Sequence, residues 1–155
     1  MDIIYKNGDI TQCEEKIIIH GCNAQGKMNS GVAKSLREKY PNLTWKVYKK
    51  SFDENNGLTL GNVIVGRSND KIILNAITQE FYGYDGKLYL NYSSLEKCLI
   101  FADSVCDFDI NGVIEPVAMP RIGAGRAGGN WNIIENIIKS SFKRRQPIVY
   151  DYEEK

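Results

Sequence analysis

Two glycine-rich segments contain the residues best suited to chemistry. They are residues 22–31 (CNAQGKMNSG) and residues 123–130 (GAGRAGGN), and each leads into a helical pattern. Glycine lets backbone amides approach a ligand closely, and the first turn of a helix adds partial positive charge. Such loops favour a phosphate or diphosphate. A purely structural role fits either turn alone equally well, because glycine-rich turns commonly punctuate α/β chains.

Other site types find little support in the sequence. The second segment lacks the Gly-Lys-Ser/Thr of a Walker loop, and no acidic residue follows it at the distance typical of dinucleotide-binding folds. Four cysteines, Cys13, Cys22, Cys98 and Cys106, form no Cys-x-x-Cys pair, and His20 is the single histidine. We therefore expect no metal site, no disulfide framework and no cofactor.

Length and charge restrict the class of protein. The chain has 155 residues, 43% of them hydrophobic, which predicts one domain over 1–155 with a sizeable core. A net charge of +1 argues against strong nucleic-acid or membrane binding. No apolar run is long enough to span a bilayer, and the first residues do not resemble a signal peptide. We expect a cytoplasmic monomer without a membrane partner.

Short β-branched runs alternate with amphipathic helical patterns. Strands are predicted at 3–4, 17–19, 63–65, 72–74, 113–114, 117–119 and 148–150, most of them too continuously apolar to be half-exposed. Helices are predicted at 32–40, from 41 through 52, at 95–106 and at 131–142. This order indicates a three-layer α/β/α domain with a mixed, mostly parallel sheet. Ligands of such sheets bind beyond the carboxyl ends of the central strands.

The same segments resemble the macrodomains, a family that binds ADP-ribose. The resemblance rests on residues 8–11 (GDIT), 20–24 (HGCNA) with 31–33 (GVA), and 119–125 (MPRIGAG) followed by Trp131. These blocks occur in the family's order and extend over essentially the whole chain. The most similar branch is the stand-alone one that includes ADP-ribose 1''-phosphate phosphatases. The resemblance implies ADP-ribose or ADP-ribose 1''-phosphate as the ligand.

The resemblance also implies where the adenine lies. The Asp9 carboxylate would accept a hydrogen bond from the adenine amino group, and the Ile10 amide would meet a ring nitrogen. Tyr150 or Tyr152 would pack on the ring. The alternatives are an Asx-turn at Asp9 and ordinary sheet cover by either tyrosine.

Three residues are candidates for catalysis. Asn23 is expected to reach the distal ribose, or instead to cap the turn that follows it. His20 would transfer a proton, or instead be a structural residue at the end of a buried strand. Asp85 would assist His20 from a flap over the distal ribose formed by residues 81–87, or instead belong to a hairpin turn.

The remaining predicted contacts come mainly from the two glycine-rich segments. Arg126 either touches phosphate or points into solvent. Valine at Gly125 or Gly128 is expected to block the ligand without unfolding the protein. The full set of predicted ligand-binding residues is Asp9, Ile10, Cys22, Asn23, Ala24, Met28, Ser30, Gly31, Val32, Thr78, Pro120, Ile122, Gly123, Ala124, Gly125, Arg126, Ala127, Gly128 and Tyr150.

The function that these features favour is metal-independent hydrolysis of ADP-ribose 1''-phosphate to ADP-ribose and phosphate. One alternative is a module that only binds ADP-ribose. Another is an ADP-ribosyl hydrolase acting on modified protein or nucleic acid. Gln79 and Ala127 stand where the lysine-dependent glycohydrolases of the family have Lys and Asp, which argues against their covalent-lysine mechanism.

Overall fold

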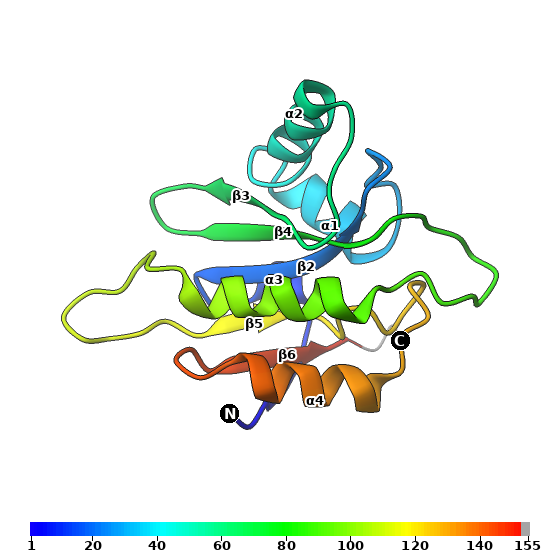
Figure 1. The fold of residues 1–155 in the computed structure, drawn as a ribbon. Coiled ribbons are helices and arrows are strands. Elements are labelled where there is room, and N and C mark those ends of the chain that lie inside the picture. Colours follow the sequence, from blue (N-terminus) through cyan, green and yellow to red (C-terminus); the bar gives the residue numbers. More distant parts are fainter. Residues whose placement is uncertain (153–155) are drawn as a thin grey trace.

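The computed structural model describes residues 1–152, and its order of strands and helices is the predicted one (Figure 1). The elements are β1 (Ile4–Asn7), a 3-10 turn η1 (Ile10–Gln12), β2 (Ile17–Asn23), α1 (Gly31–Lys39), α2 (Trp45–Asn55), β3 (Val63–Arg67), β4 (Ile72–Gln79), α3 (Tyr92–Ser104), β5 (Val117–Met119), α4 (Trp131–Ser141) and β6 (Pro147–Asp151).

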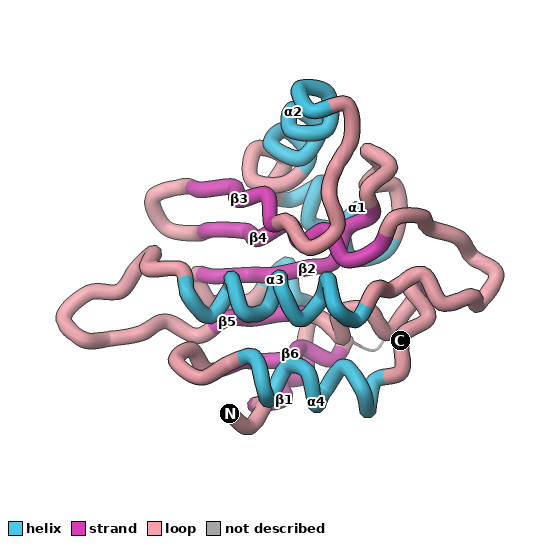
Figure 2. The backbone as a smooth tube through the Cα atoms, viewed as in Figure 1, coloured by secondary structure: helices cyan, strands magenta, loops and turns pink. Residues whose placement is uncertain are grey.

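The strands form a single six-stranded sheet in the order β1-β6-β5-β2-β4-β3 (Figure 2). All neighbouring strands are parallel except β3, which pairs antiparallel with β4. The prediction of a mixed, mostly parallel sheet is therefore confirmed. Because β2 lies between β4 and β5, their carboxyl ends meet at one edge of the sheet.

Helices cover both faces of the sheet, which confirms the three layers. Helices α3 and α4 pack on the face turned toward the viewer in Figure 1, while α1 and α2 pack against β2 and β3 from the other side. Consecutive residues of β2 show the alternation: Ile17 and Ile19 belong to the core under α3 and α4, and Ile18 packs with Leu36 of α1. All four side chains are fully buried.

Strand β1 is exposed along its length and lies at an edge of the sheet, with only β6 as neighbour. Two details of the sequence prediction are wrong. Val113 and Ile114 are 58% and 40% exposed and lie in the described connection between α3 and β5, outside the sheet. Helix α3 ends at Ser104, so Cys106 is exposed rather than part of its apolar face.

The described residues contain no helix that is both long enough and apolar enough to cross a membrane.

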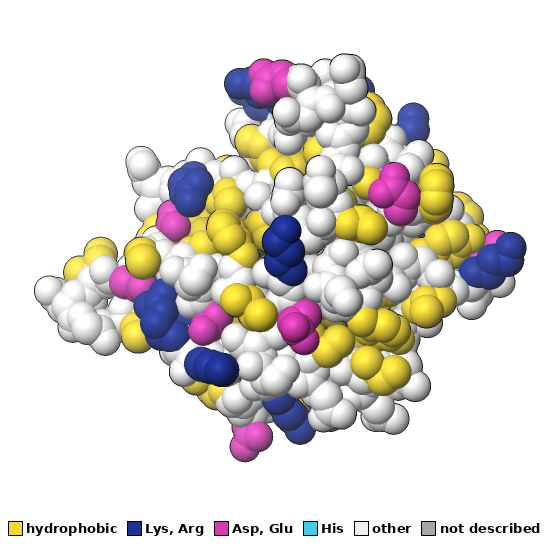
Figure 3. Space-filling view, viewed as in Figure 1, with side chains coloured by type: hydrophobic (Ala, Val, Ile, Leu, Met, Phe, Trp, Pro, Cys, Tyr) yellow, Lys and Arg dark blue, Asp and Glu magenta, His cyan; other side chains and the backbone are white. Residues whose placement is uncertain are grey.

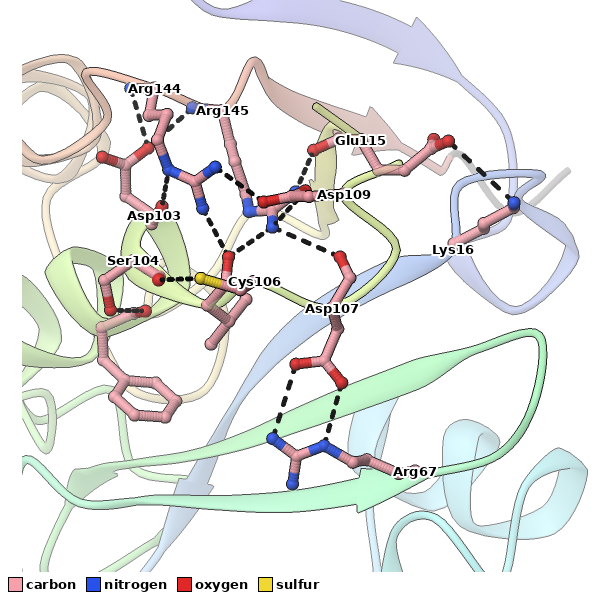
Figure 4. A network of polar contacts seen from close by, with 12 residues as sticks. Lys16, Arg67, Asp103, Ser104, Cys106, Asp107, Asp109, Glu115, Arg144 and Arg145 are labelled. Carbon is pink, nitrogen blue, oxygen red and sulfur yellow. Dashed lines mark hydrogen bonds and ion pairs between the residues drawn. The ribbon is translucent and has the colours of Figure 1, made fainter. Parts of the chain in front are cut away.

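A buried arginine holds the connection between α3 and β5 at the end of the sheet opposite the connection 80–91 (Figures 1 and 4). The Arg145 side chain is fully buried. Its guanidinium donates to the carbonyl oxygen of Glu115 at 2.7 Å, to Oδ1 of Asp109 at 2.8 Å and to the carbonyl oxygen of Val105. Charge-assisted hydrogen bonds replace the water that this buried cation has lost.

We predict that Arg145→Leu lowers the free energy of unfolding by about 3–5 kcal/mol, because buried oxygen atoms lose their donor. Urea denaturation measures the change. Arg67→Gln is the control, because Arg67 pairs with Asp107 in the same region but its side chain is 56% exposed. The control should lose no more than about 1 kcal/mol. Equal losses in the two variants would contradict the structural role given to Arg145.

Candidate functional site

A cleft of about 310 Å³ opens at the carboxyl ends of β2, β4 and β5. Its lining comes from residues 20–23, 27–33, 78–79, 82–84, 120–123 and 125–127. The segments that form it lie at the right-hand end of the molecule in Figure 1. Both glycine-rich segments contribute to the lining, and the cleft lies at the edge of the sheet where the sequence analysis expects a ligand. Binding of a ligand there stays a prediction.

The first wall of the cleft is the start of α1. Ser30 is the N-cap residue of α1, but its hydroxyl makes no capping hydrogen bond with a described residue. No residue between 1 and 152 accepts a hydrogen bond from the amides of Gly31, Val32 or Ala33. These three amides and the positive end of the helix dipole therefore suit an anion.

The second wall is the loop that follows β5. Within the described part of the chain, the amides of Gly123, Gly125, Arg126 and Ala127 also lack acceptors. The carbonyl oxygen of Ala127 accepts hydrogen bonds from the backbone amides of residues 89 and 90, at 2.8 and 3.0 Å, which fixes this loop against the connection 80–91. The two walls thus present free backbone donors to the same cleft, as a diphosphate requires.

The charge of the cleft also favours an anion. Its described lining includes Lys27, Arg121 and Arg126 but neither Asp nor Glu. Arg121 is already neutralised by an ion pair with Asp151 and lies over the Trp131 ring, with 4.9 Å between the guanidinium carbon and the ring centroid. The cleft therefore keeps a positive local charge in a protein that is nearly neutral overall.

A buried hydroxyl on the cleft wall lacks a protein partner. Thr78 is 1% exposed, and its Oγ1 forms no hydrogen bond with any residue of the described chain. A buried polar atom without a partner is costly, so such an atom beside a cleft indicates a contact supplied from outside the protein.

His20 lies on β2 and is 1% exposed. The amide group of Asn75 donates to the carbonyl oxygens of Leu43 and Ile64, so its Oδ1 must accept, and the His20 Nε2 atom 2.6 Å away carries the proton. Burial lowers the pKa of His20 to about 4, although this hydrogen bond acts in the opposite direction. His20 is therefore neutral near pH 7. Its predicted proton transfer stays a prediction, one that both its burial and its pKa argue against.

Cys22 lies next to His20 but is no candidate nucleophile. Its Sγ is 3.7 Å from Nε2 of His20, and burial raises the pKa of the thiol far above its usual range. The thiol stays protonated and unreactive.

The structure shows Asn23 in its alternative role. Its Nδ2 donates to the carbonyl oxygen of Lys27 at 3.0 Å, and its Oδ1 accepts from the Gln25 amide at 2.9 Å. The Tyr48 hydroxyl adds a hydrogen bond to the Asn23 carbonyl oxygen at 2.7 Å. Asn23 caps the turn and also lines the cleft, so its contact with a ribose stays a prediction.

The expected pairing of Asp85 with His20 is wrong. Asp85 accepts hydrogen bonds from the Tyr89 hydroxyl at 2.8 Å and the Lys87 amide at 3.2 Å, and it lies outside the cleft lining. These hydrogen bonds lower the pKa of its carboxyl group. The flap itself is present, because Tyr82 and Tyr84 line the cleft. Figure 3 shows hydrophobic side chains gathered at this end of the molecule.

The residues expected at the adenine lie outside the cleft lining. Asp9 forms the Asx-turn, with its Oδ1 accepting from the Thr11 amide at 2.9 Å and the Thr11 hydroxyl at 2.8 Å. The Tyr150 hydroxyl donates to Glu15, and its ring packs in the core that includes Ile10. Their contact with adenine stays a prediction. Tyr152 is 62% exposed.

Most of the predicted residues do line the cleft. Those inside it are His20, Cys22, Asn23, Met28, Ser30, Gly31, Val32, Thr78, Pro120, Ile122, Gly123, Gly125, Arg126 and Ala127, and those outside it are Asp9, Ile10, Ala24, Asp85, Ala124, Gly128 and Tyr150. Lining residues that the sequence analysis did not list include Lys27, Ala33, Gln79 and Arg121, while Tyr82 and Tyr84 belong to the flap that it expected. Their presence in or beside the loops that follow β2, β4 and β5 could have identified the charged and aromatic members as lining residues.

We predict that the two glycine variants behave differently, contrary to the expectation that both leave the fold intact. A Cβ at Gly128 would lie 2.3 Å from the Lys87 carbonyl oxygen, at a φ of +75°, whereas a Cβ at Gly125 would meet nothing within 4 Å. Gly128→Val should lower the free energy of unfolding by about 2–4 kcal/mol, and Gly125→Val by less than about 1 kcal/mol. Urea denaturation measures both. Equal stabilities would contradict the close packing of Gly128 on the connection 80–91.

We predict that His20 makes stability depend on pH. The unfolded imidazole gains a proton below its ordinary pKa of 6.5, while the folded ring stays neutral down to about 4. The stabilisation is therefore complete above pH 6.5 and lost as the pH falls toward 4. Over that interval the wild type should lose about 3 kcal/mol more than His20→Gln, as measured by urea denaturation. If the free energy of unfolding of wild type and of His20→Gln changed equally with pH, the assignment of His20 as a buried neutral ring would be wrong.

Comparison with known proteins places these features in a family. The Macro domain model matches residues 19–138. An uncharacterized 17.5 kDa protein of Enterobacteria phage T4, from its tk-vs intergenic region, is 32% identical and covers 99% of this chain and 98% of its own length. The ADP-ribose 1''-phosphate phosphatase of Saccharomyces cerevisiae is 27% identical over 89% of this chain and 92% of the yeast protein.

The DNA ADP-ribosyl glycohydrolase of Mycobacterium tuberculosis is 24% identical over 92% of this chain, which spans only 39% of that protein's length. A solved structure of a protein of unknown function from Bacteroides thetaiotaomicron is 31% identical, with a TM-score of 0.81 over 97% of this chain and 98% of that one. Thermosipho africanus DarTG in complex with ADP-ribose has the same fold at 16% identity, with a TM-score of 0.74 over 99% of this chain and 43% of that one. Since the Macro domain model matches most of the sequence and these proteins align along nearly all of it, the chain belongs to the macrodomain family.

Proposed function

We propose that the cleft binds ADP-ribose and that the protein hydrolyses ADP-ribose 1''-phosphate. The observation that supports this best is the convergence of free backbone amides from the start of α1 and from the loop 123–127 on one positively charged cleft. Amides fixed in this way can hold a diphosphate, and they can also stabilise charge that develops on a reacting phosphoryl group. The phosphatase of yeast is among the relatives.

In this proposal the diphosphate lies between the two walls and the ends of the ligand extend in opposite directions. The adenine reaches Asp9 and Ile10 beyond the cleft, with Tyr150 beside it. One carboxylate oxygen of Asp9 is occupied by Thr11, while the other accepts no hydrogen bond from a described residue and remains for the adenine amino group. The distal ribose lies near Asn23 and beneath the flap.

The proposed reaction is attack of water on the phosphorus of the 1''-phosphate. The bond between phosphorus and the ribose oxygen breaks, and the products are ADP-ribose and inorganic phosphate. The protein contributes positioning and charge stabilisation, because the described cleft lining holds no carboxylate and His20 is neutral. The described residues contain no group of three His, Cys, Asp or Glu side chains arranged to hold a metal ion. Independence from metal stays a prediction, which the assay in EDTA tests.

A second candidate function is release of ADP-ribose from modified DNA. Phe81, Tyr82 and Tyr84 are 61%, 43% and 66% exposed beside the cleft, and exposed aromatic rings can stack on nucleobases. A relative of this chain is a DNA ADP-ribosyl glycohydrolase. Gln79 and Ala127 still lack the groups of the lysine-dependent mechanism, so this activity would need a different one.

We predict that the wild-type protein releases inorganic phosphate from ADP-ribose 1''-phosphate in excess EDTA. Gly125→Val should bind ADP-ribose at least about 10-fold more weakly and lose the activity, because its side chain occupies open space at the cleft wall. Calorimetric titration and a phosphate-release assay measure the two effects. The rate should show no inflection near the ordinary pKa of histidine.

The controls separate the candidate functions. If the protein binds ADP-ribose but releases no phosphate, it is a module that only binds ADP-ribose. If the same preparation releases ADP-ribose from modified DNA, the second candidate function is favoured. A rate limb near pH 6.5 that disappears in His20→Gln would restore His20 as the acid or base.

A further inference from the structure

Two cations at the cleft are available for a ligand. Lys27 belongs to the loop before α1 and Arg126 to the loop after β5, and both side chains line the cleft and are exposed. Arg121, the third cation of the lining, already pairs with Asp151. Neither Lys27 nor Arg126 forms an ion pair with a carboxylate among residues 1–152. The cleft therefore has cationic groups that the protein itself does not use.

Contacts within the protein restrain the backbone of Lys27 and the side chain of Arg126. The Lys27 amide donates to the Tyr48 hydroxyl at 3.1 Å, and the Lys27 carbonyl oxygen accepts from Asn23 at 3.0 Å. The Arg126 guanidinium lies over the Tyr84 ring of the flap, with 4.5 Å between its carbon and the ring centroid. A stacked guanidinium keeps its N–H groups available for a phosphate, and less conformational freedom is lost when it binds.

The backbone amides and the two cations can bind different groups of one ligand. In the proposed function the free amides of the two walls hold the diphosphate, and the side chains of Lys27 and Arg126 remain for another anion. A phosphomonoester carries nearly two charges and several acceptor oxygens, so it gains more from such cations than a neutral hydroxyl does. On this basis we propose that Lys27 and Arg126 form a phosphomonoester subsite beside the diphosphate site and make the protein selective for ADP-ribose that carries a terminal phosphate. This inference rests on the proposed function and names its specificity-determining residues.

The test uses inorganic phosphate as the probe, because it is not consumed. Phosphate is titrated by calorimetry into protein saturated with ADP-ribose, so that the diphosphate site is already filled. Wild type should bind phosphate saturably, and Lys27→Gln and Arg126→Gln should each weaken it at least about 10-fold. Affinity for ADP-ribose should fall by less than about 5-fold, because each variant removes one positive charge from the cleft but leaves the backbone amides in place. Tyr84→Leu should weaken phosphate by about 2- to 5-fold, because Arg126 loses the ring that holds it.

Lys34→Gln is the matched control. Lys34 is an exposed lysine on α1 outside the cleft lining, so its loss changes the net charge equally without touching the subsite. It should leave both affinities unchanged. Equal phosphate binding by wild type and the two cleft variants would overturn the subsite, as would an absence of phosphate binding to ADP-ribose-saturated wild type.

The same proteins separate this inference from the proposed function. If phosphate binds as expected but no phosphate is released from ADP-ribose 1''-phosphate, the subsite stands and the enzymatic proposal fails. If Lys27→Gln and Arg126→Gln hydrolyse the substrate with the wild-type KM, the subsite fails and the enzymatic proposal stands. Failure of wild type to bind ADP-ribose would overturn both.

Discussion

The parallel pairing of β2 with β4 and with β5 is the constraint on which the rest of the structure depends. β2 pairs along its whole length with β4, from Ile17 beside Ile72 to Asn23 beside Gln79, and β5 pairs with its other edge. Parallel strands with helices on both faces must be apolar on both sides, as the fully buried 17–19 run is. Since all three strands end at the same edge, the chain must leave them through loops that meet there, and those loops form the cleft.

Buried polar groups fix this arrangement more specifically than the apolar core does. Asn75 of β4 is fully buried and bonds His20 of β2, the Ile64 carbonyl oxygen of β3 and the Leu43 carbonyl oxygen before α2. A shift of register would leave these atoms buried without partners, which costs far more than the loss of one apolar contact. His20 therefore has a clear structural role, and its depressed pKa is the electrostatic consequence of that role.

The two ends of the sheet differ in whether their polar and charged groups have partners within the protein. At one end the two terminal nitrogens of the Arg145 guanidinium donate to carbonyl and carboxylate oxygens and so hold the connection between α3 and β5, while its Nε has no described partner. At the other end the amides of two loops and the Thr78 hydroxyl have no described hydrogen-bond partner, and Lys27 and Arg126 form no ion pair with a described carboxylate. The buried Thr78 hydroxyl costs stability while it is unpaired, whereas the two exposed cations are hydrated and stay available for a ligand.

The order of strands and helices, the mixed sheet and the two loops that form the cleft could be predicted from the sequence, because hydrophobic periodicity and glycine spacing are local signals. The sequence also supported the resemblance on which the family rests. The tertiary structure was needed to show which candidates lie together. It pairs His20 with Asn75 instead of Asp85, places the Asn23 side chain in hydrogen bonds within the turn that follows it, and leaves β1 and residues 113–114 exposed. It also separated Gly125 from Gly128, which are equivalent in sequence but not in space. Burial, hydrogen-bond partners and free space depend on segments distant in the chain, so no local pattern contains them.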